Sequence, residues 1–164
     1  MNNIEFIKDF CERYNITNYT INDDLSIDVY DDVDLDFDIF RDFDKLNYIP
    51  IKFNKVSGYF SCSDNNLKSL KNSPIYVGRS FYCDNNMLTS LEYSPDYVGG
   101  DFICNYNRFT SLEYLSKHIG NEIQCYYNPL ESLEGITTSY NKLFCDDNKD
   151  KLIRKHKLKQ SINL

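Results

Sequence analysis

The chain has 164 residues, of which 41% are hydrophobic and 15% aromatic, and its formal net charge is −7. This size and composition suit one folded domain and exclude a disordered tail, while the negative charge argues against binding to duplex DNA or anionic membranes. Because no apolar run approaches the ~18 residues of a membrane span and the N-terminus lacks the features of a signal peptide, we expect a cytoplasmic protein with reduced cysteines.

The first predicted elements are a helix and several short strands. Residues 3–15 place apolar residues at helical spacing, and residues 21–37 alternate apolar and polar residues as strands do. The apolar helix face consists of Ile7, Phe10, Cys11 and Tyr14, and the apolar strand positions are Ile27, Val29, Val33 and Leu35. We interpret residues 1–58 as an N-terminal cap, formed by a helix and a β-hairpin, followed by one degenerate repeat.

An acidic stretch overlaps these strands. Residues 23–44 contain ten aspartates. Residues 34–38 carry alternate aspartates, as at the beginning of a calcium-binding loop, but Ile39 stands where that loop needs glycine and Lys45 where it needs glutamate. We therefore expect these aspartates on the solvent side of an end strand. The alternative is a negative strip that imitates nucleic-acid phosphates or docks on a basic protein.

Residues 59–148 consist of five units that repeat with a period of about 21 residues. The steps between successive cysteines are 21, 21, 21 and 20 residues, and an asparagine stands three residues after each cysteine. The cysteines are Cys62, Cys83, Cys104, Cys125 and Cys145, and the asparagines are Asn65, Asn86, Asn107, Asn128 and Asn148. Apolar residues recur at fixed positions after the asparagine, including Leu70, Leu91, Leu112 and Leu133. This regularity predicts stacked turns in which equivalent residues form ladders.

The unit resembles the leucine-rich repeat, in which apolar residues two apart on a strand are followed by asparagine and further apolar residues. Phe102, Cys104 and Asn107 show this pattern. Residues 88–107 also resemble repeats in small proteins of bacteriophages and of bacteria with AT-rich genomes. This resemblance covers residues 16–148. It implies an α/β leucine-rich-repeat-like solenoid with one short parallel strand per repeat and a mostly irregular convex side.

The C-terminal segment completes the predicted domain, which spans residues 1–164. Residues 151–160 are basic and include the apolar residues Leu152, Ile153 and Leu158. We expect a basic C-terminal helix within residues 149–164 that closes the array.

The cysteines raise the question of a metal or redox site. No Cys-x-x-Cys pair occurs, and His118 and His156 are remote from any ligand pattern. Cysteine is also a small apolar residue that packs well at inward strand positions. We therefore predict buried thiols, no metal site and no cofactor, with a metal or disulfide cluster as the alternative.

The positions beside the inward Phe and Cys residues should face outward, because side chains alternate along a strand. Tyrosine, asparagine and aspartate on a rigid frame are typical of binding surfaces, and the carboxylates favour a basic partner. The alternative is that the tyrosines only cover the sheet. The candidate partner-binding residues are Tyr59, Tyr82, Asp84, Asp101, Ile103, Asn105, Tyr106, Tyr126, Tyr127 and Phe144, and Ser61 and Ser63 belong to the same outward rows.

No Ser/His/Asp arrangement or glycine-rich phosphate loop is present, so we predict no catalytic residues. We expect a non-enzymatic, monomeric or weakly self-associating module that binds a protein with a basic surface, without direct nucleic-acid or membrane binding. The phage resemblance suggests a host protein as partner, such as a defence or regulatory factor in the host cytoplasm. The alternatives are a virion structural or assembly component and an acidic mimic of nucleic acid.

Overall fold

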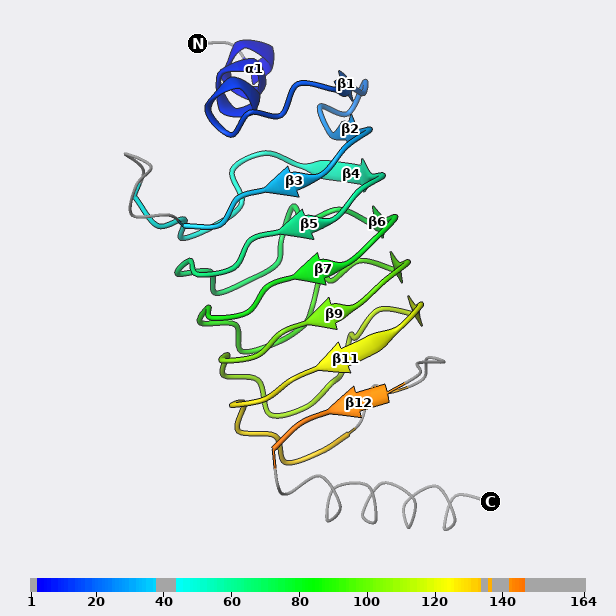
Figure 1. The fold of residues 1–164 in the computed structure, drawn as a ribbon. Helices are drawn as coiled ribbons and strands as arrows, with labels where there is room; N and C mark the ends of the chain where they lie inside the picture. Colours follow the sequence, from blue (N-terminus) through cyan, green and yellow to red (C-terminus); the bar gives the residue numbers. More distant parts are fainter. Residues whose placement is uncertain (1–2, 38–43, 134–135, 137–141, 147–164) are drawn as a thin grey trace.

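The structure is a computed structural model that describes residues 3–37, 44–133, 136 and 142–146. It begins with helix α1 (Asn3–Arg13) and continues as a β-solenoid, in which the winding chain adds strands to two sheets (Figure 1). Sheet A contains β1 (Tyr19–Ile21), β2 (Ile27–Val29), β4 (Phe53–Val56), β6 (Tyr76–Val77), β8 (Tyr97–Val98) and β10 (His118–Ile119). Sheet B contains β3 (Val33–Asp34), β5 (Phe60–Ser61), β7 (Phe81–Tyr82), β9 (Phe102–Ile103), β11 (Glu122–Gln124) and β12 (Lys142–Phe144).

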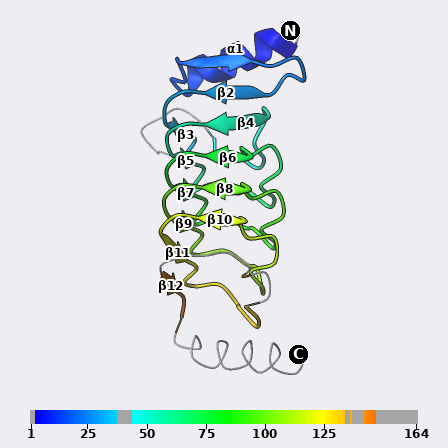
Figure 2. The ribbon, with the colours of Figure 1, turned by 90° about the vertical axis from the view of Figure 1, so that its right-hand side faces the viewer.

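The strands of both sheets stack in parallel, except that β1 and β2 form an antiparallel hairpin. Figure 2 shows sheet A from β2 to β10 as a regular stack. The prediction of a parallel solenoid is therefore confirmed. Among the described residues no helix is long and apolar enough to cross a membrane.

The second strand of each turn is the main difference from the predicted fold, which had one strand per repeat. Val77 and Val98 point into the core, whereas Tyr76 and Tyr97 point outward, so this side of the solenoid is a sheet and the chain is mostly β. Valine and tyrosine favour strands, but a strand of two residues is too short to produce a recognisable alternation.

The interior consists of ladders of identical or similar residues. Phe60, Phe81 and Phe102 stack along one row, with ring centroids 5.7 and 5.2 Å apart. All six cysteines are buried and free, which confirms the prediction of core thiols. Burial raises the pKa of the Cys62 and Cys83 thiols well above the usual value, so both remain protonated and unreactive. Within the described part of the chain, no group of three His, Cys, Asp or Glu side chains is placed to hold a metal ion.

The buried asparagines satisfy the backbone where the chain leaves sheet B. The Asn86 side-chain amide donates to the carbonyls of Cys62 at 2.9 Å, Cys83 at 3.3 Å and Asp84 at 3.2 Å, and its oxygen accepts from the Leu67 amide at 2.9 Å. Asn65 and Asn107 make equivalent bonds. Each buried group left without a partner would cost about 1–3 kcal/mol, so this ladder fixes the turn.

The turns approach each other closely after sheet A. A Cβ atom on Gly99 would lie 2.2 Å from the carbonyl oxygen of Gly78, and one on Gly120 would lie 2.2 Å from that of Gly99. Only glycine fits such a row, since the neighbouring atoms belong to the backbone and cannot rotate away.

The N-terminal region follows its prediction in outline. Helix α1 buries Ile7, Phe10 and Cys11 and lies beside the β1–β2 hairpin (Figures 1 and 2). Val33 is fully buried and pairs with Phe60, so β3 is the first strand of sheet B. The predicted C-terminal helix and Asn148 lie outside the described residues.

Candidate partner-binding face

The outer side of sheet B combines carboxylates with aromatic rings. We define the acidic face as the outward residue of each sheet B turn together with the residues two positions before and after it. The outward row is Asp34, Ser61, Tyr82, Ile103, Gln124 and Phe144. The row before it is Asp32, Tyr59, Ser80, Asp101, Glu122 and Lys142, and the row after it is Asp36, Ser63, Asp84, Asn105, Tyr126 and Asp146.

The structure therefore brings most of the predicted partner-binding residues onto one surface. Tyr59, Tyr82, Asp84, Asp101, Ile103, Asn105, Tyr126 and Phe144 all lie in these three rows, and none is fully buried. Tyr106 and Tyr127 lie one residue beyond the third row, at the corner where the chain leaves the sheet.

Negative charge is concentrated on this face. The three rows contain seven carboxylates and one basic residue, Lys142, whose ammonium lies 3.3 Å from Glu122. Just outside the rows, Arg79 lies 3.9 Å from Asp32. Because neighbouring turns are only ~4.8 Å apart, these carboxylates create a negative field that an approaching cation would relieve.

A hollow of about 360 Å³ opens at the N-terminal end of the acidic face. It is lined by Asp34, Asp36, Tyr59, Ser61, Ser63, Asp64, Tyr82 and Asp84. Its aromatic residues, Tyr59 and Tyr82, meet edge to face, with ring centroids 6.1 Å apart. A hollow with aromatic and carboxylate groups suits a cationic side chain, which gains from both.

Two serines of this hollow differ from the prediction, because Ser61 and Ser63 are buried and not exposed. The Ser61 hydroxyl donates to Asp36 at 2.5 Å, the Ser63 amide donates to the same carboxylate at 2.6 Å, and the Ser63 hydroxyl donates to Asp84 at 2.7 Å. The two aspartates thus cover the serines. Burial raises the pKa of Asp36, and the nearby Asp34 and Asp84 raise it further, although the bonds from Ser61 and Ser63 oppose this shift.

The corner beside the acidic face carries a stacked pair of exposed rings. Tyr106 and Tyr127 are 53% and 62% exposed, and their ring centroids lie 4.3 Å apart with an interplanar angle of 14°. Their φ angles are 52° and 55°, in the left-handed region. Such a backbone costs a residue with a Cβ atom roughly 1–2 kcal/mol, a cost that asparagine and aspartate partly avoid.

The outer side of sheet A carries a different arrangement, which the sequence analysis missed. Lys55, Tyr76, Tyr97 and His118 form one column. The Lys55 ammonium lies 5.2 Å from the centre of the Tyr76 ring, and the rings below it stack at 4.8 and 4.5 Å. These residues stand 21 positions apart, so the repeat period itself was the signal that could have revealed the column.

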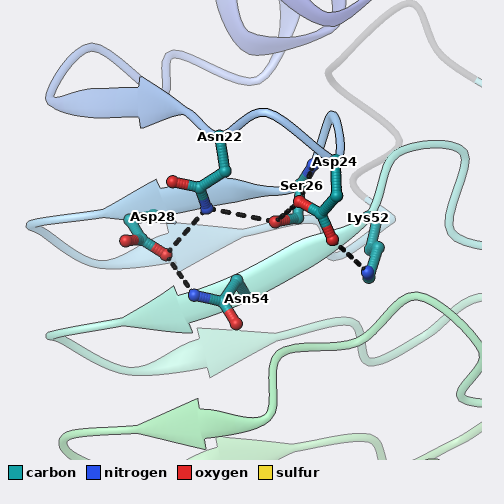
Figure 3. Close-up of polar contacts among 6 residues, drawn as sticks. All are labelled: Asn22, Asp24, Ser26, Asp28, Lys52 and Asn54. Atoms are coloured by element: carbon teal, nitrogen blue, oxygen red, sulfur yellow. Dashed lines mark hydrogen bonds and ion pairs between the residues drawn. The ribbon is translucent and has the colours of Figure 1, made fainter.

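Charged groups on the sheet A side have local partners. Lys117 lies 2.9 Å from Asp96. Near the hairpin, Asp28 accepts hydrogen bonds from Asn54 at 2.7 Å and Asn22 at 3.3 Å, while Lys52 lies 2.5 Å from Asp24 (Figure 3). The bond from Lys52, reinforced by Ser26, holds the pKa of Asp24 well below its usual range.

The protein is thus a parallel β-solenoid with one acidic outer face. Comparison of the chain with protein-family models, with curated proteins and with solved structures yields no match.

Proposed function

We propose that the protein is a non-enzymatic binding module that recognises a basic segment of a protein partner through its acidic face. The observation that carries this proposal is the concentration of seven carboxylates and a single lysine beside tyrosines on one outer surface. The outer side of sheet A provides a contrast, because its column contains Lys55 and no carboxylate, and the nearby Asp96 is paired with Lys117.

The hollow supplies the first contact with the partner in this proposal. A lysine or arginine side chain seated there would lie among Asp34, Asp36 and Asp84 and beside Tyr59 and Tyr82. A cation on an aromatic ring contributes about 0.5–1 kcal/mol at an exposed site. The surrounding carboxylates add attraction and accelerate the encounter with a basic partner.

The sequence of the repeat indicates in which cell the partner would be found. Resemblance to small bacteriophage proteins favours a partner in the host cell, such as a defence or regulatory protein. A rigid array of outward polar and aromatic side chains suits such recognition, since little side-chain entropy is lost on binding.

The test compares two variants that remove equal charge. Asp34→Asn with Asp84→Asn neutralises the acidic face and retains a side-chain oxygen acceptor at each position. Asp28→Asn with Asp96→Asn makes the same charge change on the sheet A side. Immobilised full-length chains are exposed to bacterial lysate, and the retained proteins are quantified by mass spectrometry.

We expect one stoichiometric partner that is retained by the wild type and by the sheet A variant, and lost from the acidic-face variant. Equal retention by all three chains would contradict the proposal. If duplex DNA and the wild-type protein compete for the same partner, the alternative of nucleic-acid mimicry would be favoured.

A further inference from the structure

Four exposed tyrosines occupy a backbone conformation that side chains with a Cβ atom seldom adopt. The φ angles are 68° at Tyr93, 52° at Tyr106, 66° at Tyr114 and 55° at Tyr127. Elsewhere in the same two corner rows the chain uses Asp64, Asn72 and Asn85, the residue types that tolerate this conformation. Tyrosine is thus present at these corners despite backbone strain, and strain of this kind clusters at functional sites.

The two corners differ in their surroundings. Tyr106 and Tyr127 stand beside the acidic face, and the Asp146 carboxylate accepts hydrogen bonds from the Tyr127 amide at 2.9 and 3.1 Å. Tyr93 lines a groove on the opposite corner that also contains Lys52, Lys71 and Asp96, and Lys52 is paired with Asp24. The first corner therefore has a carboxylate beside its rings, whereas the second carries charges of both signs.

The stacked pair leaves one ring face open. The corner row runs from Asp64 through Asn85 and Tyr106 to Tyr127, one turn apart. Tyr127 covers one face of the Tyr106 ring, and Asn85 stands one turn from Tyr106 on the other side. Asn85 is short, and its amide donates to the Asp64 carboxylate. We call this arrangement the step, because the Asn85 side chain is shorter than the neighbouring Tyr106 ring and the Asp64 carboxylate lies one turn beyond Asn85.

A guanidinium group fits this step better than an ammonium group does. It is planar and weakly hydrated, so it stacks on an aromatic ring while its edge donates to carboxylates, whereas lysine presents a strongly hydrated point charge. We infer that the Tyr106–Tyr127 pair is an arginine-selecting platform for the partner segment. This inference rests on the proposed function and adds the side-chain preference of the same face.

The test uses two fluorescently labelled peptides of equal charge, hexaarginine and hexalysine, and measures binding to the full-length chain by fluorescence polarisation. The wild type is expected to bind hexaarginine about three- to five-fold more tightly than hexalysine. Tyr106→Asn with Tyr127→Asn should remove this preference, because hexaarginine affinity falls more than hexalysine affinity does. Tyr93→Asn with Tyr114→Asn, which removes two equally strained tyrosines from the other corner, should keep it.

Two further measurements keep the outcome interpretable. Circular dichroism establishes that each variant is folded, and asparagine already occupies this row at Asn85. The single change Tyr106→Asn uncovers the Tyr127 ring in the same way, so it should keep part of the preference, which only the double variant removes. Tyr106→Phe retains the ring and should preserve it.

The outcomes separate the two proposals. If the wild type binds neither peptide, the proposed function itself fails. If it binds both peptides equally, or if the folded double variant Tyr106→Asn with Tyr127→Asn retains the arginine preference, the platform is overturned while recognition of a basic partner stands.

Discussion

The two outer sides of this solenoid are built on the same repeat but differ in their charge. On the sheet A side, Tyr97 is stacked between Tyr76 and His118, and Asp96 is paired with Lys117. On the sheet B side, carboxylates gather around a hollow with few cations near them. The difference is one of charge, because Asp96 on the sheet A side is paired with a lysine, whereas Asp36 and Asp84 on the sheet B side bond to neutral serines and keep their negative charge.

This contrast predicts a separation of effects. Substitutions on the sheet A side should lower the free energy of unfolding and leave binding unchanged. Substitutions on the acidic face should lower affinity and leave the fold intact, since removing one of several like charges relieves repulsion.

The largest expected effect on stability is at the glycine row that follows sheet A. In Gly99→Ala the new Cβ would meet the Gly78 carbonyl oxygen at 2.2 Å, so the turns must move apart. We expect a loss of about 3 kcal/mol or more in the free energy of unfolding, measured by urea denaturation. Gly100→Ala is the matched control, because its nearest atom is the Ser80 hydroxyl oxygen at 2.6 Å, which can rotate away with loss of one bond from the Asp101 amide, and its nearest backbone atoms lie at 3.1 Å. Equal losses in the two variants would contradict the role of the close backbone approach.

A smaller loss is expected in the aromatic column. Tyr97→Ala removes two ring contacts, at 4.8 and 4.5 Å, each of which stabilises by about 0.5–1.5 kcal/mol. We expect a loss of roughly 2 kcal/mol in the free energy of unfolding, with hexaarginine affinity unchanged. Tyr82→Ala on the acidic face should show the reverse, a weaker affinity with a smaller loss of stability, because Tyr82 has only an edge contact with Tyr59 at 6.1 Å. Reduced affinity in Tyr97→Ala would undo the proposed division between the two sides.

The rows of sheet B could be predicted from the repeat period of the sequence. Rows such as Phe60, Phe81 and Phe102 are visible because one residue type recurs at one spacing, and alternation then assigns Tyr82 and Ile103 to the outside. The column on sheet A was equally periodic but changes residue type from Lys55 to Tyr76 and then to His118. It was missed because a two-residue strand carries no alternation of its own.

The hollow could not be predicted, because it depends on contacts between turns. Ser61 and Ser63 are polar and stand at outward positions, yet both are buried. Their burial follows from Asp36, 25 residues before Ser61, and from Asp84, 21 residues after Ser63. Pattern analysis assigns a side chain to a face but does not show which neighbour covers it.

Acidification provides the finest test of the difference between the two sides. Asp36 faces Asp34, Asp84 and Tyr59 in the hollow, and its pKa is raised by burial and by the two neighbouring carboxylates. The folded chain therefore favours the protonated form, so the stability contributed by this group is present at low pH and is lost as the pH rises through its folded pKa. Binding of a cation has the opposite requirement, because it needs the ionised carboxylate.

Hexaarginine keeps its charge throughout this range, so a change in its affinity reports on the protein. As the pH falls from 7 toward 4, Asp36 should protonate before ordinary aspartates, whose pKa is about 3.9, and affinity should weaken by about ten-fold. Circular dichroism should show the fold retained, with Asp24 still ionised beside Lys52. Asp36→Asn should bind more weakly at pH 7 and respond only at lower pH. An affinity that does not change with pH would mean that the hollow is not where the cation binds, and the surface beyond it, from Asp101 to Asp146, would then have to supply the attraction.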